Sequence, residues 1–311
     1  MRTHVVIPDS QVKPGVDTRY LSWVGNYLVD QFAHDDICII HLGDFADMPS
    51  LSSYDKGKRA MEGRRYMQDI KAANDAWALL NEPLRSFNLR KQRGRHAQWW
   101  PERHILLGNH EYRIERAIED DAQLEGLMSL DHLDYATYGW QVHPFLEVVE
   151  LDGVLYSHYF YRPLTGKPYA GENLETRLKD IGASFTMGHQ QTYKTAVRYV
   201  NGRQQRGLVS GACYLHDEDY LGYQGNTQWR GILVCHEVED GEYSLMEVSL
   251  DYLSRRYEGV TLKEADLQEW AKERLAGYKR PRSYAFIAED EMPRNATGKV
   301  LHRELKKKYS N

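Results

Sequence analysis

Five short polar clusters in this chain of 311 residues hold side chains that can bind metal, and most of them follow an apolar run. The clusters are Asp9-Ser10-Gln11, Gly43-Asp44, Gly108-Asn109-His110-Glu111, His158, and Gly188-His189-Gln190-Gln191. A short apolar run is typical of a buried strand, and open α/β sheets build their binding sites beyond the carboxyl ends of such strands. The sequence therefore predicts an α/β fold whose strand ends carry ligands for divalent cations.

The apolar runs themselves predict two kinds of sheet structure. Buried strands are expected at Val5–Ile7, Ile37–Ile40, Ile105–Leu107, Val154–Tyr156 and Phe185–Met187. Later in the chain, Asn201-Gly202 is a strong hairpin turn signal, and a second turn is expected at Asp240-Gly241. A mixed two-sheet sandwich with helices outside fits this order of elements.

A helical insertion is expected at residues 49–100. Its apolar side chains Tyr66, Ile70, Ala73, Trp77 and Leu80 recur at helical spacing. We expect this helix to lean over the predicted metal cleft or to lie beside it. The basic residues at the start of the insertion form either a solvated face or a contact for an anionic substrate.

The charge of the chain is unevenly distributed. Residues 1–256 carry a net charge of −8 and residues 257–311 a net charge of +3, which together give the net charge of −5. An acidic body is not the usual electrostatic pattern of a nucleic-acid surface. Bound metal ions would neutralise several carboxylates, however, so the sign of the charge says little about the substrate.

Cysteine usage and hydropathy indicate a cytoplasmic protein without a membrane partner. The three cysteines, Cys38, Cys213 and Cys235, are an odd number without metal-type spacing, which predicts buried reduced thiols. No run of about 18 apolar residues suggests a membrane span, and the N-terminal residues have no signal-peptide apolar region.

Taken in order, the five clusters resemble the pattern of the calcineurin-like metallophosphoesterases, which runs D-x-H, G-D, G-N-H-[DE], H, G-H-x-H. The resemblance covers residues 1–255, and the stretches Ser50–Asp55 and Gly211–His216 are similar to phage-encoded members. It implies a four-layer αββα sandwich of mixed sheets. Gln11 and Gln191 depart from the pattern, because the family usually has histidine at both positions.

The resemblance implies two divalent metal ions. One ion, here called the second metal, would take Asp44, Asn109, His158 and His189, and the first metal would take Asp9, Gln11 and Gln191 together with a bridging Asp44. A glutamine offers only a neutral amide oxygen, which suits Mn²⁺ or Mg²⁺ better than Zn²⁺. We therefore expect a weak first site. A single tightly bound ion and the loss of activity are the alternatives.

The resemblance also implies residue roles and a reaction. His110 would protonate the leaving oxygen or hold transition-state charge, Glu111 would orient His110, and Arg113 would clamp phosphate or lie on a helix surface. The implied activity is a metal-dependent phosphoric ester hydrolase, a phosphodiesterase or nuclease acting on DNA, RNA or nucleotides, in the host cytoplasm if phage-encoded. A phosphomonoesterase and a noncatalytic metal-stabilised binding protein are the alternatives.

The last part of the chain, residues 256–311, resembles a different family. The stretches Leu275–Pro281 and Met292–Lys299 are similar to the C-terminal end of acyl-CoA synthetases of the adenylate-forming family, and Lys299 falls on that family's lysine. A helix from Thr261 to Ala276, a strand at Ser283–Ala288 and a basic helix from Val300 make a small α+β appendage. Since the large domain of that family is missing, we expect an appended or fused segment, with an acylation target at Lys299 as the alternative.

Overall fold

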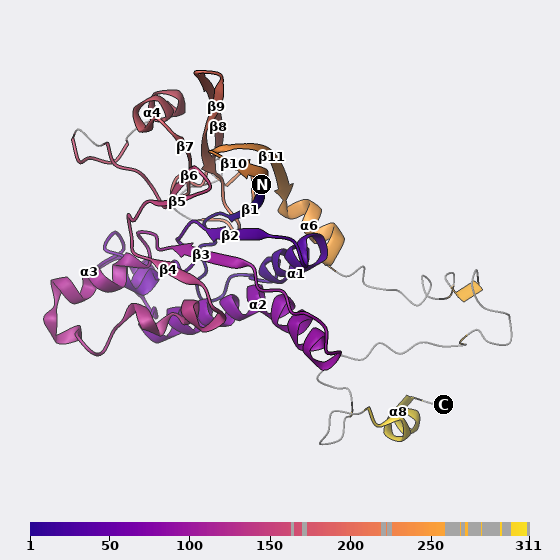
Figure 1. Cartoon of the computed structure of the whole chain (residues 1–311). Helices are drawn as coiled ribbons and strands as arrows, with labels where there is room; N and C mark the ends of the chain where they lie inside the picture. The colour runs from indigo at the N-terminus through magenta and orange to yellow at the C-terminus, as the bar shows by residue number, and fades with distance from the viewer. Residues whose placement is uncertain are drawn as a thin grey trace. The chain divides into compact units, whose positions relative to one another are not determined.

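The computed structural model describes residues 1–162, 165–169, 173–218, 222, 226–258, 268, 271–272, 281, 293 and 300–309. The chain divides into two compact units, Met1–Glu258 and Gly259–Asn311. The larger unit has a mixed α/β fold with two sheets, and Figure 1 traces it from the N-terminus.

The first sheet is built around three of the predicted strands. Its order is β11-β10-β1-β2-β3-β4. The bounds are β1 Arg2–Ile7, β2 Ile37–His41, β3 Glu102–Leu106, β4 Gln141–His143, β10 Gly231–Glu239 and β11 Glu242–Ser249. Strands β1 to β4 are parallel, whereas β10 is antiparallel to β1 and β11 to β10. The carboxyl ends of β1, β2 and β3 therefore meet at one edge.

The second sheet has the order β5-β6-β7-β9-β8. Its strands are β5 Val149–Leu151, β6 Val154–Ser157, β7 Ser184–Met187, β8 Tyr193–Val200 and β9 Arg203–Ser210. Strands β6, β7 and β9 are parallel, and β8 returns to β9 as an antiparallel hairpin. The hairpin turns at Asn201 and Gly202, where the sequence predicts it, because both residues adopt positive φ.

The helices of the larger unit cover the outer faces of its two sheets. The α-helices are α1 Tyr20–Phe32, α2 Tyr66–Arg93, α3 Tyr112–Asp120, α4 Leu174–Ile181, α6 Leu250–Tyr257 and, in the smaller unit, α8 His302–Tyr309. Short 3₁₀ helices are η1 Pro49–Leu51, η2 Arg59–Met61, η3 Ala122–Leu124, η4 Leu130–His132 and η5 Asp134–Tyr138. Figure 1 shows α1 and α2 together on one side of β1 to β3.

Three apolar cores hold these layers together. The first joins α1, α2 and α6 to one face of the first sheet, with Trp77 and Ile39 among its members. The second joins the other face of that sheet to the second sheet, through residues such as Ile40 and Tyr156. The third joins the remaining face of the second sheet to α4 through Phe185. Successive side chains of a strand point to opposite faces of its sheet, so these cores bury both faces of both sheets.

The predicted helix of the insertion forms as α2. Its apolar positions Ile70, Ala73, Trp77 and Leu80 are buried in the core shared with α1 and the first sheet. The apolar stripe is therefore the face by which α2 packs against the rest of the unit.

Parts of the smaller unit carry sequence predictions that lie outside the described residues. These are the helix Thr261–Ala276, except for isolated positions, the strand Ser283–Ala288 and Lys299. The basic final helix is confirmed as α8. Among the described residues, every helix is too short or too polar to cross a membrane.

Candidate metal centre

The five predicted clusters meet directly beyond five strand ends. Asp9, Asp44 and Asn109 follow β1, β2 and β3 of the first sheet, whereas His158 and His189 follow β6 and β7 of the second. Ligand atoms of Asp44, His158 and His189 lie within 4.8 Å of one another. The two sheets thus deliver side chains to one cluster, although the residues are far apart in the sequence.

Asp44 lies at the centre of this cluster. Its Oδ1 accepts a hydrogen bond from the backbone N–H of His110 at 2.9 Å, and its Oδ2 accepts one from Gln11 Nε2 at 3.2 Å. The same Oδ2 lies 3.3 Å from His158 Nε2. A buried carboxylate that contacts three of the five clusters has the position that a bridging ligand between two cations needs.

His158 faces oxygen atoms on both sides of its ring. Its Nδ1–H donates to the carbonyl oxygen of Leu42 at 2.7 Å. Its Nε2 lies 3.0 Å from Asn109 Oδ1 and 3.3 Å from Asp44 Oδ2. A neutral ring in this tautomer would turn a lone pair toward two acceptor oxygens, which is unfavourable unless a proton or a cation lies between them.

His189 and Asn109 complete this half of the cluster. The Nδ1–H of His189 donates to Asn109 Oδ1 at 2.8 Å, and its backbone N–H donates to Asp9 Oδ1 at 3.1 Å. The amide oxygen of Asn109 therefore receives contacts from His158 and His189. This arrangement brings together all four residues predicted for the second metal.

Two buried oxygen atoms of the first cluster have no hydrogen-bond partner. They are Oδ2 of Asp9 and Oε1 of Gln11, in residues that are fully buried. An unpaired buried acceptor costs about 1–3 kcal/mol, so such atoms are rare unless an ion or a water satisfies them. Rotating the Gln11 amide by half a turn would direct its oxygen toward Asp44, as a shared cation requires.

The amide oxygen of Gln191 is already engaged in a hydrogen bond. Gln191 Oε1 accepts a hydrogen bond from Tyr214 Oη at 2.8 Å. Tyr214 was not predicted as a site residue, although it lies within the Gly211–His216 stretch singled out in the sequence. A cation bound by Gln191 would have to compete with this hydrogen bond for the amide oxygen.

The ring of His110 lies between Asp44, Asp47 and Arg113 in the contacts that it makes. Its Nδ1 lies 2.8 Å from Asp47 Oδ1, its Nε2 lies 3.7 Å from Asp44 Oδ2, and Arg113 Nη2 donates to that Nε2 at 3.1 Å. Arg113 also donates to the backbone oxygen of Asp47 at 2.7 Å. Asp47 was missed in the sequence, where its only signal is a second aspartate in the loop after β2.

The predicted role of Glu111 is corrected by its contacts. Its Oε2 accepts from the backbone N–H groups of Asp44 and Gly108, and its Oε1 accepts from Ala46 N–H and Tyr135 Oη, at 2.9–3.1 Å. Glu111 is fully buried, and three of these four hydrogen bonds come from backbone N–H groups of the strand-end loops. It positions the backbone that carries Asp44, and Asp47 is the carboxylate that orients His110.

A polar loop reaches the edge of the site through a lysine. Lys13 Nζ lies 2.7 Å from Glu218 Oε2 and 3.3 Å from Asp47 Oδ2. His216 Nε2 also contacts Glu218, at 2.7 Å. Lys13 thus connects the loop that holds His216 and Glu218 to Asp47.

Four cluster residues adopt a backbone conformation that is unusual for residues other than glycine. The φ angles are 46° at Gln11, 47° at Asp44, 65° at His189 and 55° at Gln191. The left-handed conformation costs about 1–3 kcal/mol of free energy for each such residue. It is found mainly at ligand sites, where the surrounding structure enforces it. The strain is shared by the three loops that follow β1, β2 and β7, which makes them candidates for a ligand site.

Two glycines are required for the carboxylates to fit. A Cβ atom at Gly108 would lie 2.1 Å from Asp44 Oδ1, and one at Gly188 would lie 2.3 Å from Asp9 Oδ1. Only glycine leaves space for these oxygens. This explains why glycine precedes the ligands in both clusters.

The charges of the cluster are strongly coupled. Burial raises the pKa of Asp9 to about 7 and lowers that of His189 to about 4. Burial also opposes charge on Asp44, yet His110 and His158 hold its pKa well below the usual value. Asp44 in turn outweighs the burial of His158 and raises the pKa of this imidazole to about 9. A proton on His158 thus lies where a metal ion would supply positive charge.

The donor set fits divalent cations. Carboxylate, amide and imidazole donors suit Mn²⁺, and the oxygen-rich half suits Mg²⁺ as well. The unpaired oxygens of Asp9 and Gln11 and the acceptor-facing Nε2 of His158 are all explained by cations among them. On chemistry alone, the residues predicted for the metal sites are compatible with that role.

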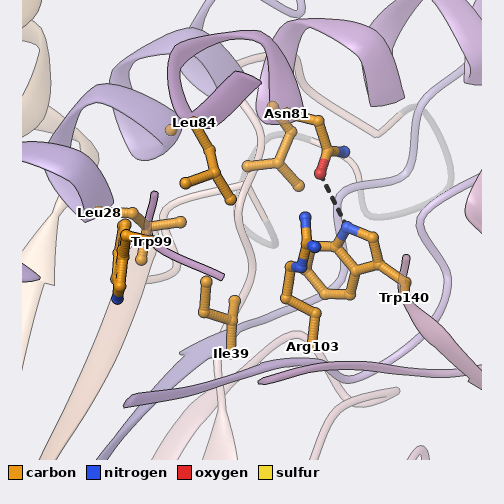
Figure 2. A pocket seen from close by; sticks show the side chains of 9 residues that line it. Leu28, Ile39, Asn81, Leu84, Trp99, Arg103 and Trp140 are labelled. Carbon is orange, nitrogen blue, oxygen red and sulfur yellow. Dashed lines mark hydrogen bonds between the residues drawn. The ribbon is translucent and has the colours of Figure 1, made fainter. Parts of the chain in front are cut away.

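A cavity elsewhere in the unit is of a different kind. Figure 2 shows it between α1, α2 and the first sheet, where Trp140 Nε1 donates to Asn81 Oδ1 at 2.8 Å. Its walls include Ile39 and Arg103, which lie within β2 and β3 and not beyond their carboxyl ends. This cavity belongs to the packing of the first core.

Comparison with known proteins points to acyl-CoA ligases. The chain is 36% identical over 81 residues to a 2-succinylbenzoate–CoA ligase of Lactococcus lactis, covering 22% of this chain and 18% of the relative. It is 49% identical over 49 residues to the same kind of ligase of Geobacillus kaustophilus, covering 16% and 10%. An uncharacterised acyl-CoA ligase of Bacillus subtilis is 28% identical over 112 residues, covering 35% and 21%.

These matches are partial. The chain spans between about a tenth and a fifth of the length of these curated relatives. No family model matches the chain.

The comparisons correct the family and the activity drawn from the metallophosphoesterase resemblance. The matching relatives carry the names of ligases and not of phosphoric ester hydrolases, phosphodiesterases or nucleases. The predicted partners are wrong together with the activity. These were DNA, RNA, nucleotides and other phosphate esters. The physical reason is that carboxylate, amide and imidazole donors specify a cation, whereas the substrate depends on groups around the cation.

Proposed function

We propose that the unit Met1–Glu258 binds two divalent metal ions, Mn²⁺ or Mg²⁺, at its strand ends. The second metal would be held by Asp44, Asn109, His158 and His189, and the first by Asp9, Gln11, Gln191 and the shared Asp44. The observation that carries this proposal is the pair of buried oxygens without a partner, Asp9 Oδ2 and Gln11 Oε1. Buried acceptors of this kind require a cation, a donor or a water.

The two sites would be unequal. Two imidazoles serve the second metal, whereas the first has two neutral amides, one of which accepts from Tyr214. Since an amide oxygen contributes no charge, the first site depends on Asp9 and Asp44 for its affinity. We propose that the second metal binds first and that the first site fills only at higher concentration.

The neighbouring residues would direct the chemistry of an anionic or polar ligand. A bound divalent ion polarises an oxygen ligand and so supplies Lewis-acid chemistry. His110 would hold its proton at Nδ1, which lies 2.8 Å from Asp47 Oδ1, while its Nε2 accepts from Arg113. Arg113 adds positive charge beside His110, and Glu111 keeps the strand-end loops in register.

Equilibrium Mn²⁺ binding to the metal-free full chain tests this proposal. We expect binding to two unequal classes of site, and both classes should be weakened in Asp44→Asn because the two sites share this carboxylate. The control is Asp69→Asn, because Asp69 is also a buried carboxylate with an unpaired oxygen and belongs to α2. Binding that is unchanged in Asp44→Asn, or equally reduced in Asp69→Asn, would contradict the proposed ligands.

The finer description of the fold and the chain organisation is also a proposal. We propose a four-layer α/β/β/α arrangement for residues 1–255, supported by the three successive cores. Residues 256–311 would be a small α+β segment appended or fused to it. A cytoplasmic location is supported by three free, buried cysteines.

A second candidate function follows from the names of the relatives, which are acyl-CoA ligases. We propose that residues 256–311 derive from the C-terminal end of such a ligase, because Leu275–Pro281 and Met292–Lys299 resemble that end. Acid–CoA ligation by this chain would then depend on Lys299.

Pyrophosphate release tests the ligase candidate. The full chain is incubated with ATP, CoA and 2-succinylbenzoate, and acid-dependent release of pyrophosphate is measured against Lys299→Ala. Release that needs the acid and Lys299 supports ligation. No release from the folded chain excludes ligase activity for this sequence and leaves the metal proposal untouched.

A further inference from the structure

A second group of ligand-type side chains lies near the opposite ends of the same strands. In the parallel register, Cys38 of β2 pairs with Glu102 of β3, and His4 of β1 pairs with Cys38. Residues two apart on a strand share a face, so Cys38 and His104 face the second sheet with Ile40 and its neighbours. This places a thiol, a carboxylate and an imidazole on one face, away from the strand ends that carry Asp44.

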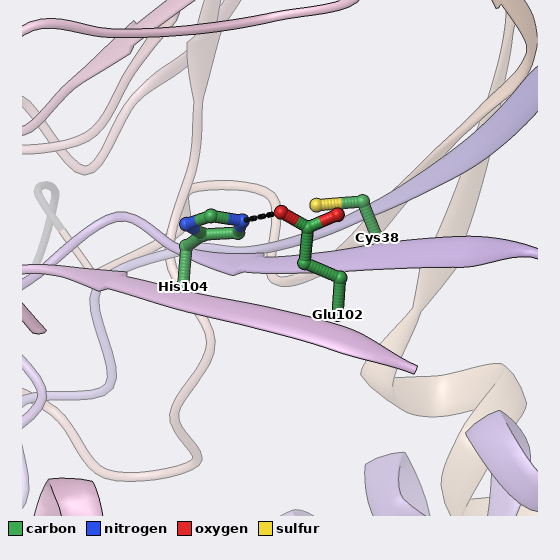
Figure 3. Close-up of side chains that lie close together, drawn as sticks. All are labelled: Cys38, Glu102 and His104. Atoms are coloured by element: carbon green, nitrogen blue, oxygen red, sulfur yellow. Dashed lines mark hydrogen bonds and ion pairs between the residues drawn. The ribbon is translucent and has the colours of Figure 1, made fainter. Parts of the chain in front are cut away.

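These side chains are close enough to share one ion. Sγ of Cys38, a carboxylate oxygen of Glu102 and a ring nitrogen of His104 lie within 4.8 Å of one another. Figure 3 shows His104 and Cys38 on either side of the Glu102 carboxylate. Cys38 and His104 are buried, whereas the side chain of Glu102 is 34% exposed and gives access from solvent.

The chain of hydrogen bonds from Glu102 through His104 and His143 to Glu147 lacks one proton. The ring nitrogens of His104 and His143 lie 2.9 Å apart, Glu102 Oε1 lies 2.9 Å from His104 Nε2, and Glu147 Oε1 lies 3.3 Å from His143 Nδ1. Three such contacts need three protons, but two neutral imidazoles carry only two. Protons directed toward Glu147 and His143 leave a lone pair on His104 Nε2, facing Glu102.

A cation between His104 Nε2 and Glu102 removes this shortage. We propose that Cys38, Glu102 and His104 bind a transition-metal ion of intermediate softness, such as Zn²⁺ or Co²⁺, at a site separate from the strand-end centre. Thiolate, imidazole and carboxylate are the donors that Zn²⁺ takes in proteins, at about 2.0–2.3 Å. On binding, the Cys38 thiol loses its proton to solvent, and the ion takes its place.

The surroundings support the three ligands. His143 accepts the Nδ1–H of His104 and passes its own N–H toward Glu147, which is the outer hydrogen bonding that orients metal-binding histidines. Arg2 opposes a cation, but its Nη2 engages the other carboxylate oxygen, Oε2 of Glu102, at 2.6 Å and leaves Oε1 toward His104. With the Cys38 thiolate and the Glu102 carboxylate, the site carries two negative charges against the single positive charge of Arg2.

The test is titration of the metal-free full chain with Co²⁺, read by the thiolate-to-cobalt charge-transfer band in the near ultraviolet. Only a site that includes a cysteine gives this band. We expect the band in the unmodified protein and in Cys213→Ser, a control thiol that is equally buried, and its loss in Cys38→Ser. Glu102→Gln and His143→Gln should each weaken Co²⁺ binding, His143→Gln by about 10–100-fold.

Two results would overturn the site. One is the absence of the band in the folded, unmodified protein at saturating Co²⁺. The other is a band that survives Cys38→Ser. If Cys38→Ser fails to fold by circular dichroism, the partly exposed Glu102→Gln decides, because an unchanged Co²⁺ affinity in that variant contradicts the assignment.

Discussion

His158 Nε2 lies 3.3 Å from Asp44 Oδ2, and this contact joins the two sheets at their strand ends. The Nδ1–H of His158 is already donated to Leu42, so Nε2 can meet the carboxylate only with a proton or a cation in between. Without metal, the raised pKa of His158 means that a proton fills this place. A metal ion would therefore displace a proton at this contact.

This exchange predicts a pH dependence of stability. The pKa of His158 is about 9 in the folded chain, above the ordinary value of about 6.5 in the unfolded chain. Its stabilising effect is complete below about pH 6.5 and is lost as the pH rises toward 9. The melting temperature of the metal-free protein should fall across this window, and the gain from saturating Mn²⁺ should be larger at the alkaline end.

Below pH 6.5 the melting temperature is less informative, because Asp9 and His189 change the stability in opposite directions. The raised pKa of Asp9 lowers stability as the pH rises from about 4 to 7, whereas the lowered pKa of His189 increases it between about 4 and 6.5. The comparison above pH 6.5 is therefore the decisive one. A metal-free melting temperature that stays level from pH 6.5 to 9 would contradict the charged His158.

Glu111→Gln should destabilise the protein strongly. The carboxylate accepts four hydrogen bonds, and an amide in its place would turn an N–H group toward backbone donors. We expect a loss of about 2–4 kcal/mol in the free energy of unfolding, measured by urea denaturation. Asp120→Asn, at the exposed end of α3, is the control and should change it little. Equal stability of the two variants would refute the positioning role of Glu111.

Asp47→Asn should lower the pKa of His110. Burial works against a charge on this ring, but the carboxylates of Asp44 and Asp47 outweigh it and raise the pKa. Removing the charge of Asp47 takes away part of that support, and NMR titration of the His110 ring in the metal-free protein measures the result. An unchanged titration would show that Asp47 does not control His110.

Replacing both amide ligands by imidazole should strengthen the first site. In the variant with Gln11→His and Gln191→His, two neutral oxygens become two nitrogen donors, which suit Zn²⁺. We expect tighter binding at the first site and a shift of preference from Mg²⁺ to Zn²⁺, measured by competitive titration. Gln190→His, at the neighbouring position, is the control. Unchanged preference in the double variant would remove Gln11 and Gln191 from the ligand set.

The sequence predicted the strands well because each buried strand is a separate apolar run that ends at a polar cluster. The runs ending at Ile7, Ile40 and Met187 became β1, β2 and β7, and the ligands meet because parallel strands end together. The sequence did not predict that Glu111 supports the loops while Asp47 orients His110. The roles of Glu111 and Asp47 differ because Glu111 is buried under the loop backbone and Asp47 faces the ring of His110. In the sequence, both are acidic residues near a histidine, and nothing distinguishes them.

The activity could not be inferred from the cluster either. Ligand types and their order specify where a cation binds, but the short matches to acyl-CoA ligases show that residues outside the clusters relate this chain to other proteins. Helix α2 is a second example of a feature that the sequence predicts only in part. Its apolar stripe predicted a helix, but only the fold showed that Trp77 packs into the core.

Anomalous diffraction from crystals of the full chain grown with Mn²⁺ would locate the bound ions themselves. We predict a strong peak among Asp44 Oδ2, His158 Nε2, His189 Nδ1 and Asn109 Oδ1, with a weaker peak beside Asp9. Folded protein saturated with Mn²⁺ that shows no peak within bonding distance of Asp44 would contradict this prediction.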